Sequence, residues 1–274
     1  LGAITVLIIH VDHIPSALAA IFRYAFQPFA VGGGFFGMVV AQTIRFGVAR
    51  GVFSNESGLG SAPIAHAAAK TTEMVREGFV AMLGPFIDTI IICSMTALVI
   101  LTTGAWQVRS SEGKILYGPG AANTAQTVSG HLVVTGPDGE PVLDETGQPY
   151  PVPTSTALTA AAFESGMKRI GPIGLYIVAF GLVFFAYSTM ISWSYYGDRC
   201  AEFLFGAKAI MPYRCVYVVL IVVGACGGLQ TIWTLADVLN ALMAVPNLIG
   251  LLALAGLVAG ETRDYLRRLD ARQF

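Results

Sequence analysis

The sequence has few charged residues and few cysteines. Charged residues make up 12% of its 274 residues, about half of the ~25% typical of soluble domains, whereas hydrophobic residues make up 55%. The four cysteines are scattered, without a CxxC spacing or clustered histidines, so we expect neither a disulfide framework nor a zinc site. Basic residues form no stripe and the net charge is −1, which gives no reason to expect a nucleic-acid partner.

The apolar residues gather in long runs, and the mean hydropathy is +0.67. Residues 79–101, 171–193 and 216–229 contain one charge or none. The first two approach the ~20 residues that cross a hydrocarbon core, and the third reaches that length with its flanks. We therefore expect an all-α polytopic membrane protein in a lipid bilayer. Because Leu1 already lies in an apolar run, we read the chain as a piece lacking its N-terminal part, without a signal peptide.

One stretch between apolar segments is both polar and rich in helix breakers, GVARGVFSNESGLGSAP at residues 47–63. Glycine costs a helix about 1 kcal/mol relative to alanine, and proline about 3 kcal/mol. We expect a helix to unwind near residues 53–60 and to resume after them. Unwound backbone is tolerated in a bilayer only where it is buried in protein or lines a cavity, and such a break often marks a transporter's binding site. The alternative is a helix–loop–helix turn at the membrane surface.

Apolar runs alternate with polar connections along the rest of the chain. Ser16–Phe29 predicts a short helix at the membrane surface. Residues 104–157 are rich in Pro, Gly, Ser, Thr and charge, so we expect an insertion outside the membrane with one small hairpin at His131–Leu143. The expected spans and shorter helices are 1–11, 35–53, 62–69, 79–101, 158–167, 173–196, 216–229 and 233–258. The expected connections are 70–78, 198–213 and a turn at 230–231, followed by a charged helical tail at 261–274.

Basic residues set the orientation of the spans. If the broken helix runs from outside to inside, nine Lys and Arg residues fall on the cytoplasmic side and five on the outer side. The turn at 230–231 holds none. This orientation puts the long insertion outside the cell and the C-terminus in the cytoplasm.

Four stretches resemble signature segments of one transporter family: residues 50–63 (RGVFSNESGLGSAP), 86–89 (FIDT), 185–198 (FAYSTMISWSYYGD) and 237–247 (DVLNALMAVPN). They are similar to the alanine or glycine:cation symporter family, the sodium:alanine symporters. The resemblance runs through nearly all of the chain except about 107–155. It implies a LeuT-like inverted-repeat fold. The chain then holds the second repeat, helices six to ten, plus the end of helix five, with an extracellular polar insertion.

On this resemblance the chain divides into five parts. Residues 1–34 hold the end of core helix five and an extracellular surface helix, and residues 35–104 hold broken helix six and helix seven. Residues 105–170 form the extracellular insertion, which is longer than the family's connection. Residues 171–260 hold helices eight to ten, and residues 261–274 form a cytoplasmic tail.

The resemblance implies that the helix break contacts an amino-acid substrate. Unwound backbone and half-helix ends suit the carboxylate and ammonium groups of a zwitterion. Phe53 is expected as one apolar wall and Trp193 as a second wall that limits the site to small side chains. The alternatives are that Asn55 and Ser57 only cap the resumed helix, and that Trp193 marks a membrane interface. The expected substrate-binding residues are Phe53, Ser54, Asn55, Ser57, Gly58, Gly60 and Trp193.

Sodium requires hard oxygen ligands. Ser188 and Thr189 match by position the hydroxyl pair that LeuT-like transporters use for one sodium ion. The alternative is that these hydroxyls bond to their own helix. Asp88 and Asp237 are lone acids within apolar spans, which are functional by default. Asp88 either belongs to an ion route or bonds to a Thr or Ser of a neighbouring helix.

The implied function is sodium-coupled symport of a small neutral amino acid, alanine or glycine, by alternating access in the cell membrane (in a bacterium, the inner membrane). Sodium is the coupling ion, and no other cofactor is expected. The alternatives are a LeuT-like carrier of another solute or driven by protons, a structural membrane subunit and, most remotely, an intramembrane serine hydrolase built on Ser57 and His66. We expect a transporter and not an enzyme.

Overall fold

Long apolar helices dominate the part of the chain that the structure describes. The computed structural model describes residues 1–26, 47–48, 51–56, 58–118, 123–128 and 131–271. Within them, four helical stretches are long and apolar enough to cross a membrane, and a pair bent by 76° near the N-terminus is a fifth candidate. At most 6% of the residues in the four apolar windows are buried. The four stretches are Met74–Thr103, Gly174–Phe205, Ala207–Cys226 and Thr231–Asp270.

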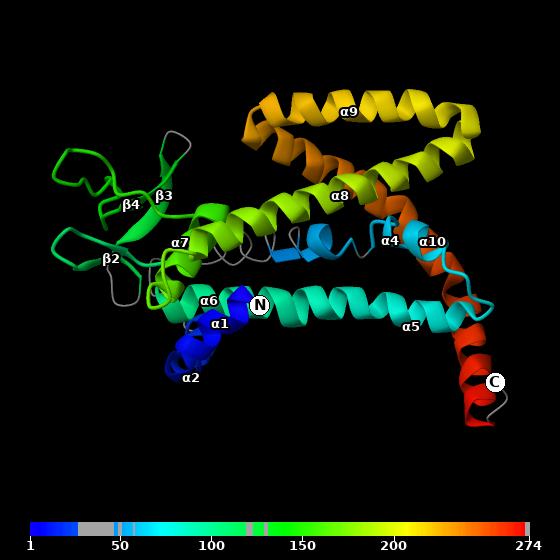
Figure 1. Cartoon of the computed structure of the whole chain (residues 1–274), viewed down its shortest axis with the longest axis horizontal. Coiled ribbons are helices and arrows are strands. Elements are labelled where there is room, and N and C mark those ends of the chain that lie inside the picture. Colours follow the sequence, from blue (N-terminus) through cyan, green and yellow to red (C-terminus); the bar gives the residue numbers. More distant parts are fainter. Residues whose placement is uncertain (27–46, 49–50, 57, 119–122, 129–130, 272–274) are drawn as a thin grey trace. The chain divides into compact units, whose positions relative to one another are not determined.

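The described residues fall into two units. The first holds those within Leu1–Pro28 and Ile92–Ala186, and the second holds those within Phe29–Ile91 and Tyr187–Phe274. In the first unit, α1 (Gly2–Ile9), α2 (Ile14–Phe26), α6 (Ser94–Thr103) and α7 (Ser155–Met167) pack with the start of α8 (Figure 1). Its core consists of Val6, Val99, Ala162, Phe163 and Met167.

The described residues between 104 and 154 form short antiparallel strand pairs instead of helices. β1 (Val108–Arg109) pairs with β2 (Ile115–Tyr117), and β3 (Thr124–Val128) pairs with β4 (His131–Thr135). The turn expected at Pro-Asp-Gly 137–139 is present, since Thr135 bridges Pro141. The prediction of one hairpin was nevertheless incomplete, because β4 pairs over its whole length with β3. Val108, Val134 and Val152 make a small core beneath these strands.

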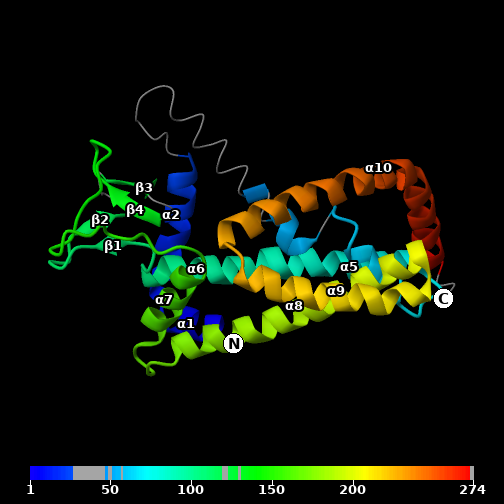
Figure 2. The same cartoon turned by 90° about the horizontal axis from the view of Figure 1, so that it is seen from above.

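The second unit contains the short α4 (Ala62–His66), α5 (Met74–Pro85), the later part of α8 (Gly174–Phe205), α9 (Ile210–Cys226) and α10 (Leu229–Asp270). Helix α9 runs back beside the end of α8, as the two views in Figures 1 and 2 show. Tyr217 Oη donates to the carbonyl of Met190 at 2.9 Å. A Cβ on Gly197 would overlap the ring of Tyr213, so only glycine permits this close approach.

Three expected connections are shorter than the sequence suggested. Residues 198–205 continue α8, residues 230–231 lie inside α10 after a turn at Gly227–Gly228, and α5 already begins at Met74. The predictions of polar connections at 198–213 and at 70–78 and of a turn at 230–231 were therefore wrong at these residues. The polar side chains of these stretches lie on the ends of helices. In α8, for example, Arg199 forms an ion pair with Glu202 one turn later, at 2.8 Å.

Candidate functional site

The expected helix break is present. Residues 51–55 are helical, the helix ends there, and α4 begins at Ala62. Between them, Glu56, Gly58 and Gly60 have positive φ angles of 52°, 85° and 85°. Glycine adopts this left-handed region without a steric penalty, which explains two of the three residue types. Arg50 and Ser57 lie outside the described residues.

A hydrogen bond across the break fixes its shape. Ser61, only 1% exposed, donates from Oγ to Oε2 of Glu56 at 2.7 Å. The backbone N–H of Leu59 donates to the carbonyl of Glu56 at 3.2 Å. Tyr196 of α8 lines the same cavity as Glu56. Ser61 therefore holds Glu56 from within the break, and Tyr196 of α8 lies near it.

Helix α10 packs against both sides of the break. The rings of Phe53 and Trp233 lie 5.4 Å apart, centroid to centroid. A Cβ on Gly60 would lie 3.1 Å from Oδ1 of Asn247, which is tighter than ordinary van der Waals contact. Gly60 is thus required twice, by its φ angle and by the proximity of Asn247.

The helix before the break is bonded to the segment that follows α5. Residues Phe86–Cys93 are π-helical and carry Asp88. Ser54 Oγ donates to Asp88 Oδ2 at 2.6 Å, which is the neighbouring-helix bond that we expected as one alternative for Asp88. Asn55 bonds to Thr89 through both atoms of its carboxamide. The role of Asp88 in an ion route stays a prediction.

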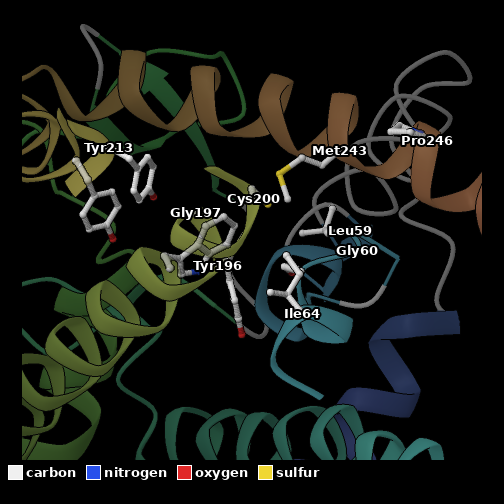
Figure 3. Close-up of a pocket in the computed structure, with 12 residues that line it drawn as sticks. Leu59, Gly60, Ile64, Tyr196, Gly197, Cys200, Tyr213, Met243 and Pro246 are labelled. Atoms are coloured by element: carbon white, nitrogen blue, oxygen red, sulfur yellow. The ribbon is translucent and has the colours of Figure 1, made fainter. Parts of the chain in front are cut away.

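Two cavities adjoin the break. The first, of about 440 Å³, lies between the break and helices α8, α9 and α10, and Figure 3 shows Leu59, Gly60 and Ile64 on one side with Tyr196 and Met243 facing them. The second, of about 1100 Å³, lies between the break and α5 and has a more polar lining. The polar groups that line it include Ser54, Asn55, Glu56, His66, Glu77 and Asp88.

The structure brings several predicted site residues together and leaves others apart. Gly60 and Trp193 line the first cavity, whereas Ser54, Asn55 and Gly58 line the second. Ser188 and Thr189 lie exposed on α8 and line neither cavity. The carbonyl of Ser188 accepts from Ser192 Oγ at 3.0 Å.

Sequence reasoning missed four residues next to the break. Trp233, Asn247, Thr89 and Tyr196 each contact it or line a cavity beside it. Three of them stand in the stretches that carry the family resemblance, but only the fold shows that they meet at the break.

His66, the histidine on which the hydrolase alternative depends, is paired with an acidic residue of α5. Nδ1 of His66 lies 2.7 Å from Oε1 of Glu77. That pairing joins α4 to α5 at the edge of the second cavity.

Comparisons with known proteins agree with the resemblance and extend it. A family model described as the sodium:alanine symporter family matches residues 1–136 and 144–273. The match includes most of residues 107–155, so the expectation that this stretch lies outside the resemblance was wrong. The sodium/alanine symporter AgcS of Methanococcus maripaludis is 40% identical, over 99% of this chain and 50% of its own length. An uncharacterised transporter of Haemophilus influenzae is 38% identical, over 99% of this chain and 50% of its own. The probable sodium/glutamine symporter GlnT of Bacillus subtilis is 30% identical, over 98% of this chain and 46% of its own length.

The chain spans about half the length of the curated relatives that it matches. The family and these relatives are transporters, not enzymes, and the membrane-capable helices are those of a polytopic membrane protein. The match to the family model covers almost every residue, including the helix break and the segments that pack on it. This chain belongs to the sodium:alanine symporter family.

Proposed function

We propose that the whole protein carries out sodium-coupled symport of a small neutral amino acid, alanine or glycine, by alternating access. The observation that carries the proposal is the helix break between residue 55 and Ala62, where Glu56, Gly58 and Gly60 have positive φ angles. Its amide and carbonyl groups suit the two charged ends of a zwitterion. Sodium and substrate then stabilise the same conformation, which couples their movement.

Three observations support a small amino acid as the substrate. The 40% identical relative is named a sodium/alanine symporter, whereas the relative named for glutamine is 30% identical. Trp193, with its bulky indole, and Gly60 of the break line one cavity. Phe53, whose ring is tilted by 60° relative to that of Trp233, adds an apolar surface at the start of the break. We assign the substrate to Phe53, Ser54, Asn55, Ser57, Gly58, Gly60 and Trp193.

For sodium we propose Ser188 and Thr189 as ligands. Their hydroxyl oxygens are of the hard type that sodium prefers. Both side chains are exposed on α8, one turn before Trp193, and are therefore accessible to a further helix. Family membership supports sodium as the coupling ion.

We propose a LeuT-like fold and a cell-membrane location for the whole protein. In this assignment residues 1–34 end core helix five, 35–104 are helices six and seven, 105–170 are the extracellular insertion, 171–260 are helices eight to ten and 261–274 are a cytoplasmic tail. The four membrane-capable stretches and the excess of basic residues on one side support it.

The test is isotope uptake by the full-length protein in proteoliposomes. We expect alanine and glycine to accumulate under an inward sodium gradient with the membrane potential clamped. If serine or glutamine accumulates and alanine and glycine do not, the proposed substrate is wrong. Accumulation under a proton gradient without sodium would support the proton-coupled alternative and refute sodium coupling.

A further inference from the structure

Two adjacent hydrogen-bonded pairs join the end of the first half-helix to the π-helical segment. Ser54 Oγ donates to Asp88 Oδ2 at 2.6 Å. In the second pair, Asn55 Nδ2 donates to Thr89 Oγ1 at 2.7 Å, and the Thr89 hydroxyl donates to Asn55 Oδ1 at 2.9 Å. Two consecutive residues of one segment therefore meet two consecutive residues of the other.

Regular helices do not favour such a double contact, because consecutive residues point to different faces. Both segments are irregular here. The first helix ends at residue 55, directly before the positive φ angle of Glu56. The second segment is π-helical over Phe86–Cys93 and follows Pro85, which has no backbone N–H to donate. π-helical segments are rare in proteins, and those that occur are often found at functional sites.

The contact also fixes how the Asn55 side chain is turned. A single hydroxyl, that of Thr89, contacts both ends of its carboxamide. These bonds hold the side chain toward Thr89, at the point where the backbone leaves the helix. The Thr89 hydroxyl thus orients the last helical residue before the break.

We propose that Asp88 and Thr89 are positioning residues that hold Ser54 and Asn55, and through them Glu56, Gly58 and Gly60 of the break, in the arrangement that binds the amino acid. This inference rests on the proposed function of the break. Thr89 acts through Asn55, and Asp88 acts through Ser54. In this account the Asp88 carboxylate serves as a hydrogen-bond acceptor and its charge is not required for ion passage.

The first test compares three variants of the full-length protein in sodium-driven alanine uptake. Thr89→Val removes the hydroxyl and nearly keeps the shape of the side chain, so it should raise the KM for alanine about tenfold with Vmax within about twofold. Thr89→Ser restores the hydroxyl and should restore KM. Thr96→Val is the matched control, because Thr96 Oγ1 donates to the Ile92 carbonyl one turn earlier in the same helical stretch, at 3.0 Å. If Thr89→Val does not give a monodisperse protein, Thr89→Ala carries the same expectation.

A double-mutant cycle tests the path through Asn55. If Thr89 acts through Asn55, then Asn55→Ala combined with Thr89→Val should raise KM no more than the larger single effect. Asp88→Ala removes the acceptor of the Ser54 hydroxyl and should raise KM about as much as Thr89→Val does, whereas Asp88→Asn keeps an acceptor and should have the smaller effect. Three outcomes would overturn the proposal, provided that the wild type transports alanine. They are additive effects of the two substitutions on KM, a Thr89→Val variant with the same KM as Thr96→Val, and loss of sodium-driven uptake in Asp88→Asn. Absence of uptake in the wild type would instead refute the proposed function, and the positioning role with it.

Discussion

The guanidinium of Arg268 donates to both carboxylate oxygens of Glu73, 195 residues earlier in the sequence, at 2.8 and 3.0 Å. Asp264, one turn before Arg268 on α10, accepts a further bond from it at 3.0 Å. The rings of Phe79 and Tyr265 lie 6.2 Å apart beside this pair. The end of α10 is thereby fastened to the start of α5, the helix that leads to the π-helical segment.

This ion pair should make stability depend on pH. The hydrogen bond from Arg268 holds the pKa of the Glu73 carboxyl below its ordinary value. Because the folded-state pKa is depressed, the contribution is complete above the unfolded-state pKa of about 4.3 and is lost as pH falls through the folded-state value. We expect Glu73→Gln to lower the thermal midpoint of the full-length protein at pH 7, by less as the pH falls below about 4.

The matched control is Glu112→Gln, since Glu112 is exposed in the segment between α6 and β2. It should leave the midpoint unchanged at every pH. An effect of Glu73→Gln that is the same at pH 3.5 and pH 7 would show that the charge of Glu73 is not what stabilises the contact.

The two glycines of the break should respond differently to alanine. Both have a φ of 85°, but a Cβ on Gly58 would meet no described residue within 4 Å, whereas a Cβ on Gly60 would lie 3.1 Å from Asn247 Oδ1. Gly58→Ala therefore meets backbone strain alone, of about 1–2 kcal/mol. Gly60→Ala meets the same strain and also requires the Asn247 side chain to move by a few tenths of an ångström, so it should reduce alanine uptake more than Gly58→Ala does. Asn247→Ala, added to Gly60→Ala, should recover part of that loss, and equal uptake by the two single variants would contradict this reading.

Trp193 should limit the size of the substrate. If its indole is a wall of the site, Trp193→Ala enlarges the cavity that it lines with Gly60. We expect uptake of glutamine relative to alanine to rise about tenfold, because the glutamine side chain is longer by a methylene group and a carboxamide and needs the added space. Trp106→Ala, in the first unit, is the control. An unchanged ratio would favour the interpretation of Trp193 as an interfacial residue.

Asp144 should order the turn at residues 144–148. Hydrogen bonds from the Thr146 hydroxyl and the Gln148 amide lower the pKa of its carboxyl, and the Thr146 and Gln148 amides both donate to Asp144 Oδ1 at 2.9 Å. Asp144→Ala should speed hydrogen exchange of these two amides about tenfold. Asp144→Asn, which keeps an acceptor, should have a smaller effect, and alanine uptake should stay as in the wild type. Unchanged exchange in Asp144→Ala would show that other contacts order the turn.

The helix break was predictable because glycine and proline act locally. Gly58 and Gly60 disfavour helix wherever they stand, and both have the positive φ that makes glycine useful. The apolar spans were predictable for the same reason, since hydropathy is summed along the sequence. Helix ends were not. Residues 198–205 are polar enough to suggest a loop, yet they continue α8, because polarity marks where a helix leaves an apolar environment and not where it stops.

The partners of the break required the fold. From the sequence, Asp88 could either belong to an ion route or bond to a Thr or Ser of a neighbouring helix. The structure shows such a bond, from Ser54. Nothing near Thr89 in the sequence indicates that it faces Asn55, 34 residues earlier. That contact depends on a π-helical turn, for which Pro85 is the only local signal and a weak one.

In the proposed transporter, sodium and a small amino acid stabilise one conformation of the same site. The most direct measurement is equilibrium binding of alanine to the purified full-length protein at several sodium concentrations, with sodium binding measured in parallel at several alanine concentrations. Linkage requires sodium to raise the affinity for alanine by the same factor by which alanine raises the affinity for sodium, and we expect that factor to be at least about tenfold. Alanine binding of equal affinity in sodium and in choline would contradict the account.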